Sequence, residues 1–414
     1  MTRAQFDFEQ AWAGRVPANW RWTRNKELLA ESQAVTVDGS EELLSVSHLT
    51  GITPKSEKNV TMTAAENLDG YRLVDTGDLV INTMWAWMGA LGVSKQSGIV
   101  SPAYGVYSPR PDAPFNPVFY DYLYRSPQYV MEMTRLSRGI WSSRLRLYPD
   151  VFLRMAIPVP PLDEQRAIAD NLDCETARID TLIEEQQRLI EMLRERRWAV
   201  VERGVALLDW NTPFKTVATL IQTGPFGSQL KSEEYKDGGV PVINPSHIVA
   251  GEVVPDPRIA VGAEKAEQLA RHRLEEGDLI AARRGDLGRC AVVGSSAAGF
   301  LCGTGSAVVR LDRARLDPSF AAIVFSSRRN RDALALASVG STMENLNSDI
   351  IGALRLPVPP LDEQRRLTAE LDQATAKIDR LIAETEQFIE LARERRSALI
   401  TAAVTGQLDV REMA

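Results

Sequence analysis

The sequence predicts an α+β protein in which two mixed α/β domains alternate with two long helices. Three observations support this. The string PVPPLDEQR occurs twice, at 158–166 and 357–365. Each copy opens a long stretch without Pro or Gly that is rich in Leu, Ile, Glu and Arg, which favours a helix. Each region before a copy holds short apolar runs between Gly and Pro residues, which is typical of strands.

The first domain is expected over residues 1–158. Its apolar run LVINTMWAWMGALGVS at 79–94 follows a Gly-Asp-Leu turn and is too short to span a bilayer. Trp85 and Trp87 alternate with apolar residues in this run, so we expect them to pack in the core. The segment PVFYDYLYRSPQYVMEMTRL later in the domain is expected to be helical.

The first long helix is expected over 159–208. Pro160 and Pro161 cannot continue a helix backwards, and Asp163 is the expected N-cap. About 25 of 42 positions are identical between the two copies and the residues that follow them. Apolar residues recur at steps of three, four and seven, as in a coiled coil. They are Leu172, Ile179, Leu182, Leu189, Leu193 and Val200, then Leu371, Ile378, Leu381, Phe388 and Leu399.

The second domain is expected over 209–357, the second helix over 358–405, and a C-terminal tail over 406–414. The runs GVPVIN, RCAVVG and GSAVVRL predict strands, and PSFAAIVFSSRRNRDALALA predicts helices. A helix of about 40 residues is roughly 60 Å long, which exceeds the width of a small domain. We therefore expect the two helices to pair with each other as an antiparallel coiled coil, with internal pseudo-twofold symmetry. Two amphipathic helices on separate cores are the alternative.

The charge distribution leaves a nucleic-acid partner open. The net charge is −7. Residues 159–210 carry seven basic and twelve acidic side chains, and residues 358–414 carry eight and eleven. The acidity therefore lies in the helical segments, and the two domains are near neutral, so each can carry a local basic face.

Few residues suit metal binding or disulfides. The three cysteines, Cys174, Cys290 and Cys302, form no CxxC pair, and the chain has three histidines. We expect no metal site, no cofactor and no disulfide framework. The amino-terminal residues lack the apolar core of a signal peptide, so we expect a cytoplasmic protein without a membrane segment.

The organisation resembles the specificity subunit of type I restriction–modification systems. The resemblance rests on PLDEQ, which opens a long helix twice, and on the segments GPFGSQLKSEEY, GIVSPAYGVY, GSTMENLN and AAVTGQLDV, and it covers essentially the whole chain. It implies two target-recognition domains, each reading one half of a split site in double-stranded DNA. It also implies that the paired helices form the spacer and that two methyltransferase subunits dock on the repeated parts. An ATP-dependent restriction subunit is a further partner whose presence stays open.

Docking and DNA-binding residues follow from this resemblance and from residue chemistry. Phosphates are bound by Lys, Arg and hydroxyl groups, and bases by Arg, Asn, Ser or Thr. The DNA-binding candidates are Lys55, Lys58, Arg138, Ser142, Ser143, Arg144, Arg146, Lys231, Arg283, Arg284, Arg289, Ser341, Thr342, Asn345 and Asn347. The partner-docking candidates are Asp163, Glu164, Gln165, Arg166, Asp362, Glu363, Gln364 and Arg365.

Two other function classes remain as alternatives. SPAY at 101–104 and NPSH at 244–247 loosely resemble the Asn-Pro-Pro-aromatic motif of a stand-alone adenine methyltransferase, but both lack the second Pro. FLCGTG at 300–305 has the wrong spacing for the glycine-rich cofactor loop that such an enzyme needs, and no P-loop is present. A coiled-coil scaffold without a DNA role is the other alternative. We expect a non-catalytic chain.

Overall fold

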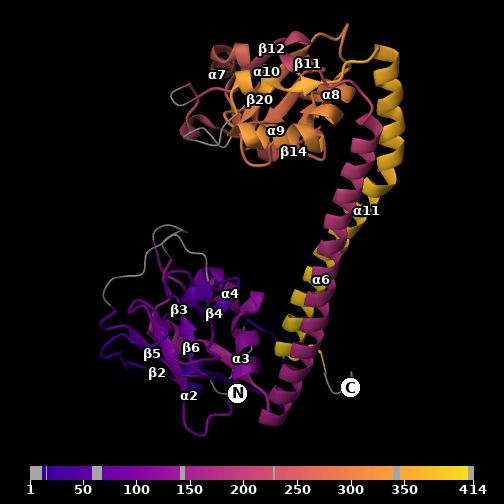
Figure 1. The fold of residues 1–414 in the computed structure, drawn as a ribbon. Helices are drawn as coiled ribbons and strands as arrows, with labels where there is room; N and C mark the ends of the chain where they lie inside the picture. The colour runs from indigo at the N-terminus through magenta and orange to yellow at the C-terminus, as the bar shows by residue number, and fades with distance from the viewer. Residues whose placement is uncertain are drawn as a thin grey trace. The chain divides into compact units, whose positions relative to one another are not determined.

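The computed structural model describes residues 12–14, 16–57, 68–139, 145–226, 229–338 and 346–408. The chain divides into two compact units, each with its own core (Figure 1). Unit 1 comprises residues 1–187 and 387–414, and unit 2 comprises residues 188–386. Each long helix therefore contributes one part to each unit.

Unit 1 is built on a four-stranded antiparallel sheet. Its strand order is β2 (Leu29–Glu31), β9 (Gly105–Pro109), β6 (Leu79–Ile81) and β7 (Leu91–Val93). Two-stranded ribbons in the described residues accompany it: β1 (Arg21–Arg24) with β10 (Ala156–Val159), β3 (Leu44–Ser47) with β4 (Gly51–Pro54), and β5 (Arg72–Val74) with β8 (Gly98–Val100). The short helices are α2 (Asn25–Leu28), η1 (Lys55–Glu57), η2 (Ala86–Met88), α3 (Pro117–Tyr124), α4 (Pro127–Leu136) and α5 (Pro149–Arg154).

Unit 2 repeats this plan. Its main sheet has the order β12 (Ala218–Thr223), β20 (Ser306–Leu311), β17 (Leu279–Ala282) and β18 (Cys290–Val292). The other strands are β16 (Ala260–Val261), β13 (Val240–Ile243) and β19 (Leu301–Cys302) in one sheet, β11 (Thr212–Pro213) with β21 (Arg355–Leu356), and β14 (Ile248–Val249) with β15 (Glu252–Val253). The short helices are η4 (Phe214–Thr216), η6 (Ser232–Glu234), η7 (Pro245–His247), α7 (Ala263–Gln268), η8 (Ala270–His272), η9 (Ser295–Ala297), α8 (Pro318–Phe325), α9 (Arg328–Ser338) and α10 (Ser348–Ala353).

The Gly-Asp-Leu sequence at 77–79 recurs at 277–279, and in both units this turn enters the same strand of the main sheet. Gly77 and Gly277 have φ angles of 94° and 83°, which favour glycine. Asp78 and Asp278 are buried, and each carboxylate accepts a backbone N–H three residues earlier, at 2.9 and 2.8 Å. The short sequence match therefore marks a structural equivalence: β6 corresponds to β17.

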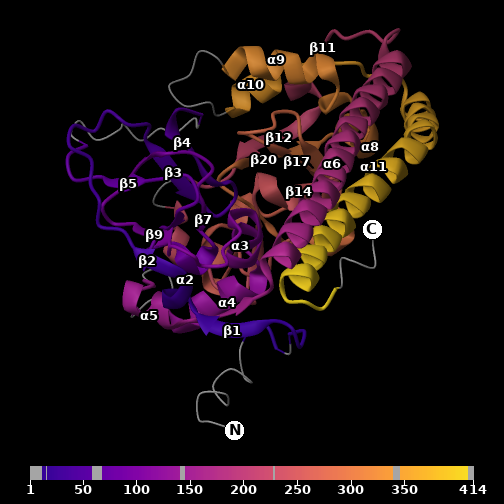
Figure 2. The ribbon, with the colours of Figure 1, turned by 90° about the horizontal axis from the view of Figure 1, so that it is seen from below.

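The two long helices, α6 (Leu162–Val205) and α11 (Leu361–Val404), pack antiparallel within each unit (Figures 1 and 2). In unit 2, Arg197 pairs with Asp379 at 2.6 Å. In unit 1, Arg396 pairs with Asp180 at 2.9 Å. These are the same pair of repeat positions with the helices exchanged, so the predicted antiparallel pairing is confirmed. The pseudo-twofold relation between the units stays a prediction.

The buried stripe of each helix differs from the predicted one. In α6 it includes Leu172, Ile183 and Ile190, whereas Leu182 and Leu189 are 36% exposed. The predicted stripe followed the leucines and missed the threonines on the buried face, which include Thr176 in α6 and Thr375 and Thr385 in α11. The prediction was also wrong for Leu381 and Phe388, which are exposed in α11.

One glutamine of the repeated string fastens each long helix to its domain. Gln165 Oε1 accepts the Asn116 N–H at 2.9 Å, and its Nε2 donates to the Pro114 and Pro160 carbonyls, both at 2.9 Å. Gln165 and its repeat equivalent Gln364 are both 0% exposed. We call each set of three hydrogen bonds a glutamine latch.

The second glutamine latch reproduces the first. Gln364 Oε1 accepts the Asp317 N–H at 2.8 Å, and its Nε2 donates to the carbonyls of Arg315 at 2.8 Å and Pro359 at 2.7 Å. The side chains of Gln165 and Gln364 are enclosed and hydrogen-bonded within one unit, so the structure gives them an internal role in place of the partner docking expected from the sequence.

The expected helix start also needs correction. The α6 helix begins at Leu162, so Asp163 lies in its first turn instead of forming the N-cap. An acidic residue there still stabilises the positive end of the helix dipole. None of the helices in the described ranges combines the length and apolarity needed to cross a membrane.

Candidate nucleic-acid interface

In unit 2, three loops meet at one end of the main sheet. They are the turn after β17 (283–289), the turn before β20 (303–305) and the segment before α10. The Arg283 N–H donates to the Gly305 carbonyl at 2.9 Å, its Nη1 donates to Thr304 O at 3.1 Å, and its Nε donates to Leu346 O at 2.6 Å. One residue therefore holds all three loops together.

Arg283 is a positioning residue in this geometry. It is 6% exposed, and its guanidinium carbon lies 5.2 Å from the centre of the Phe226 ring. Burial lowers the pKa of its guanidinium, since the charged form loses hydration. From the sequence, Arg283 was expected to be one of the DNA-binding residues. Its enclosure and its two side-chain bonds to carbonyls speak against direct contact with DNA.

Arg284 is the exposed cation of the same turn. Within the described ranges its side chain has no hydrogen bond or ion pair. The turn itself is braced, because Asp286 pairs with Arg289 at 3.2 Å and also with Arg331 of α9. Arg289 Nη1 further donates to Pro245 O at 3.3 Å. A fixed turn with one uncommitted guanidinium suits a contact to a base edge or a phosphate.

The remaining candidates of unit 2 divide between exposed and structural positions. Asn347 caps α10, because its Oδ1 accepts the Ile350 N–H at 2.8 Å. Lys231 is exposed, and its backbone N–H donates to Glu234 at 2.7 Å. Three candidates lie outside the described residues: Ser341, Thr342 and Asn345.

Unit 1 joins its three corresponding loops in the same way. The Leu147 N–H donates to Thr83 O at 3.0 Å, and in unit 2 the Leu346 N–H donates to Arg283 O at 2.9 Å. The Thr83 hydroxyl donates to Ala103 O at 2.9 Å, in the place of the Arg283 bond to Thr304. The segments SPAY and CGTG are therefore equivalent parts of one scaffold.

The two ends of the arginine-rich segment of unit 1, Arg138 and Arg146, pair with each other. Arg138 and Arg146 exchange two backbone hydrogen bonds, at 3.0 and 2.9 Å, and both residues are exposed. Lys55 lies half-buried in η1. Four candidates of this unit lie outside the described residues: Lys58, Ser142, Ser143 and Arg144.

Two exposed aromatic residues were missed from the sequence: Trp85 lies in the turn after β6, and Phe226 follows β12 and lies against Arg283. Trp85 is 49% exposed and Phe226 is 54% exposed. The expectation that Trp85 packs in the core is wrong; its ring stacks on that of the half-buried Trp87. The signal was available in principle, since Trp85 lies in the turn after the Gly-Asp-Leu strand, where unit 2 carries its arginines.

The other repeated-string residues are distributed between packing and solvent. Glu164 accepts hydrogen bonds from Trp20 at 2.9 Å and Asn19 at 2.7 Å, within unit 1. Glu363 is half-buried and lies 3.9 Å from Arg366. The exposed members of the two copies are Asp163, Arg166, Asp362 and Arg365.

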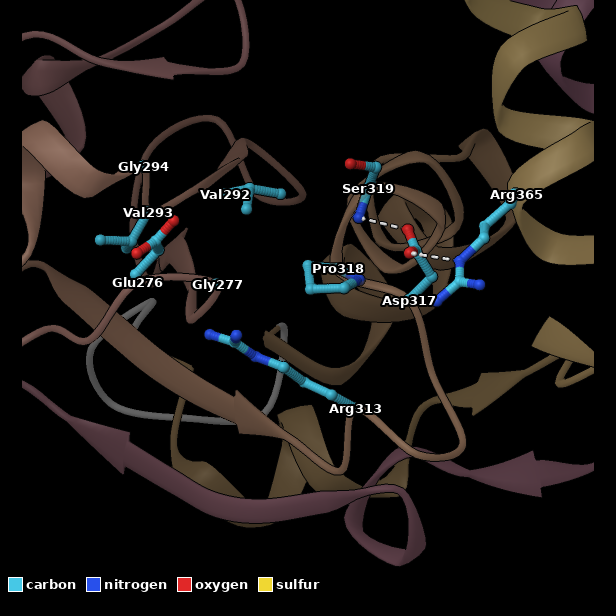
Figure 3. Close-up of a pocket in the computed structure, with 10 residues that line it drawn as sticks. All are labelled: Glu276, Gly277, Val292, Val293, Gly294, Arg313, Asp317, Pro318, Ser319 and Arg365. Carbon is cyan, nitrogen blue, oxygen red and sulfur yellow. Dashed lines mark hydrogen bonds and ion pairs between the residues drawn. The ribbon is translucent and has the colours of Figure 1, made fainter. Parts of the chain in front are cut away.

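A shallow cavity of about 360 Å³ lies beside the second glutamine latch, between the Gly-Asp-Leu turn and the start of α8 (Figure 3). One of its carboxylates already binds two neighbouring groups. Asp317 caps α8 through the Ser319 N–H at 3.0 Å and lies 3.8 Å from Arg365. A carboxylate of the chain therefore already occupies the N-terminus of α8, which is where a helix binds an anion.

Comparison with known proteins agrees with this arrangement. Residues 217–391 match the family model described as the type I restriction modification DNA specificity domain. The chain is 24% identical over 312 residues to the type I restriction enzyme EcoKI specificity subunit of Escherichia coli K12, covering 69% of this chain and 64% of that protein. It is 26% identical over 213 residues to the StySPI specificity subunit of Salmonella potsdam, covering 50% and 45%.

The chain is therefore similar to type I restriction enzyme specificity subunits, and residues 217–391 match the specificity-domain model of that family. A solved chain from work on complex assembly and conformational transition of the type I R-M system shares the fold, with a TM-score of 0.63 and 18% identity over 95% of this chain and 100% of the other. The matches span 64% and 45% of the two curated relatives' own lengths.

Proposed function

We propose that the protein is the sequence-specific DNA-binding subunit of a type I restriction–modification complex. Residues 1–158 and 209–357 are the two recognition domains, each reading one half of a bipartite site. The paired helices, within 159–208 and 358–405, set the distance between the half-sites. One observation carries this proposal: both units hold the same three loops with equivalent hydrogen bonds, while the exposed side chains of those loops differ.

The long helices support docking of two copies of one partner. Unit 1 exposes Leu182, Phe388 and Leu391. Unit 2 exposes their repeat equivalents, which are Leu381, Leu189 and Met192. Exposed apolar residues that recur in both copies of a repeat are expected at interaction surfaces. We assign these two sets, together with the exposed Asp and Arg of the repeated string, to methyltransferase subunits. A restriction subunit that uses ATP is a further expected partner.

The proposal leaves catalysis to those partners. NPSH forms the η7 turn, in which His247 is buried and its Nδ1 lies 3.1 Å from Val242 O and 3.2 Å from Asn244 N. SPAY is part of the loop scaffold through the Thr83 bond to Ala103. Both segments thus have a structural explanation, which weakens the methyltransferase alternative. The proposal also places the protein in the cytoplasm.

A domain exchange tests the proposal. Residues 1–158 are replaced by the corresponding domain of a relative, and methylated sites are mapped by sequencing in cells that carry the chimera and its partner subunits. We expect one half of the site to change and the other half to remain. A change in both halves, or no site-specific methylation with the unaltered chain, would contradict the assignment.

A further inference from the structure

The turn after β6 in unit 1, residues 82–90, presents an apolar surface. Met84 is 41% exposed, Trp85 49% and Met88 36%. The rings of Trp85 and Trp87 are stacked, with centroids 6.1 Å apart and an interplanar angle of 17°. We call Met84, Trp85 and Met88 the Trp85 platform. Burying these side chains in the unit would have been favourable, so their exposure calls for an explanation.

The platform is rigid. The backbone N–H of Trp85 donates to the Asn82 carbonyl at 2.9 Å, and the indole Nε1 of Trp87 donates to the Met84 carbonyl at 3.0 Å. The Thr134 hydroxyl of α4 donates to Trp87 O at 3.0 Å. Gly89 closes the turn with a φ of 82°. A surface that is already fixed loses little conformational entropy when it binds a partner.

The location of the platform indicates what covers it. The turn is equivalent to residues 283–289 of unit 2, where Arg284 is the exposed cation. The bond from the Leu147 N–H to Thr83 O holds it beside the segment that carries the exposed Arg138 and Arg146. An apolar surface flanked by arginines fits DNA, because phosphates pair with the cations while base edges meet the apolar groups.

We propose that the Trp85 platform contacts the 5-methyl group of a thymine in the half-site read by unit 1. This inference rests on the proposed function. The thymine methyl is the apolar group that a base pair displays in the major groove. The equivalent turn of unit 2 lacks an aromatic side chain and carries Arg284, so the two half-sites are read by opposite chemistry at the same position of the fold.

Deoxyuridine substitution tests the contact, because it removes the methyl group alone. The complex is purified through a tag on the full chain, and its preferred duplex is selected from a random pool. Each thymine of both half-sites is then replaced singly by deoxyuridine. We expect one position in the half-site of unit 1 to weaken binding about fourfold, as for one buried methyl group. Trp85→Ala should weaken binding by at least about tenfold, and in this variant the deoxyuridine effect should vanish.

Two controls make the result specific. Trp85→Phe keeps an aromatic surface and should retain part of the deoxyuridine effect. Leu207→Ala removes a fully exposed leucine of unit 2 and should bind like the unaltered chain. Any of three results would overturn the contact. They are unchanged binding by Trp85→Ala, tolerance of deoxyuridine at every position, and an equal deoxyuridine penalty in the unaltered chain and in Trp85→Ala. If the unaltered complex selects no duplex, the proposed function itself fails.

Discussion

Loss of one glutamine latch is expected to free the start of a long helix from its domain. In Gln364→Ala, the Asp317 N–H loses its acceptor and the carbonyls of Arg315 and Pro359 lose their donor. A lost hydrogen bond costs about 0.5–1.5 kcal/mol, and more when the remaining partner stays buried. Arg315 is exposed and Pro359 half-buried, so water can replace part of the loss. We therefore expect about 2 kcal/mol, or roughly a thirtyfold increase in local opening.

Hydrogen exchange measures this effect at the site. The amide of Asp317 should exchange roughly thirtyfold faster in the variant, since its protection depends on closure of the latch. Gln364→Met keeps the side-chain volume and loses all three bonds, so it should behave like the alanine variant. Asp362→Ala, at a fully exposed position of the same repeated string, should stay within about 0.5 kcal/mol of the unaltered chain. Unchanged protection of Asp317 in Gln364→Ala would refute the latch.

Three further results are expected. Arg284→Ala should weaken DNA binding by about 1–3 kcal/mol without changing the stability of the protein. Arg283→Ala should lower the stability by about 2–3 kcal/mol, because the Leu346 and Thr304 carbonyls lose their donor. Identical effects of the two variants in DNA titrations and thermal melts would contradict these roles. Burial lowers the pKa of His272 to about 4 from an ordinary 6.5, so the neutral imidazole stabilises unit 2 above pH 6.5 and this contribution falls as the pH drops toward 4. By pH 5.5 the loss of stability is about 1 kcal/mol. His272→Gln should therefore flatten the fall in melting temperature between pH 7 and 5.5. Four residues inserted after Gln187 lengthen α6 by about 6 Å and nearly preserve its buried stripe, so the DNA spacer should grow by a base pair or two. Two inserted residues should abolish site-specific methylation. An unchanged spacer with full activity in the four-residue variant would show that the helices do not set the spacer length.

The architecture could be predicted from the sequence because its signals are local or repeated. The two long helices follow from composition and from the absence of Pro and Gly, and the strands near 240, 290 and 306 follow from apolar runs between turn residues. The buried stripe was misplaced because Thr176 and Thr375 read as polar, although each lies on the buried face. A threonine can occupy such a face when its hydroxyl bonds within the helix, as Thr176 does to Leu172 O at 2.6 Å.

The candidate site was only partly predictable. Arginine clusters could be located, but the sequence does not distinguish the enclosed Arg283 from the exposed Arg284, since the difference arises from contacts with Leu346 and Thr304 far along the chain. Trp85 shows the opposite error. An aromatic residue within an apolar run suggests a core position, and only the pairing of β6 with β7 shows that it lies in the turn between them.

The repeated string can be divided by what each residue contacts. Gln165 and Gln364 fasten a helix to a domain, and Pro160 and Pro359 supply one of the carbonyl acceptors, so internal packing alone requires them at both places. Asp163 and Asp362 are exposed, as are the arginines that end the nine-residue string. The helix dipole favours an acidic residue at Asp163 and Asp362, and Arg365 lies 3.8 Å from Asp317, but neither contact requires these exposed residues to be identical in both copies. A partner that binds each copy in the same way would explain it, and this argument supports two equivalent docking surfaces on one chain.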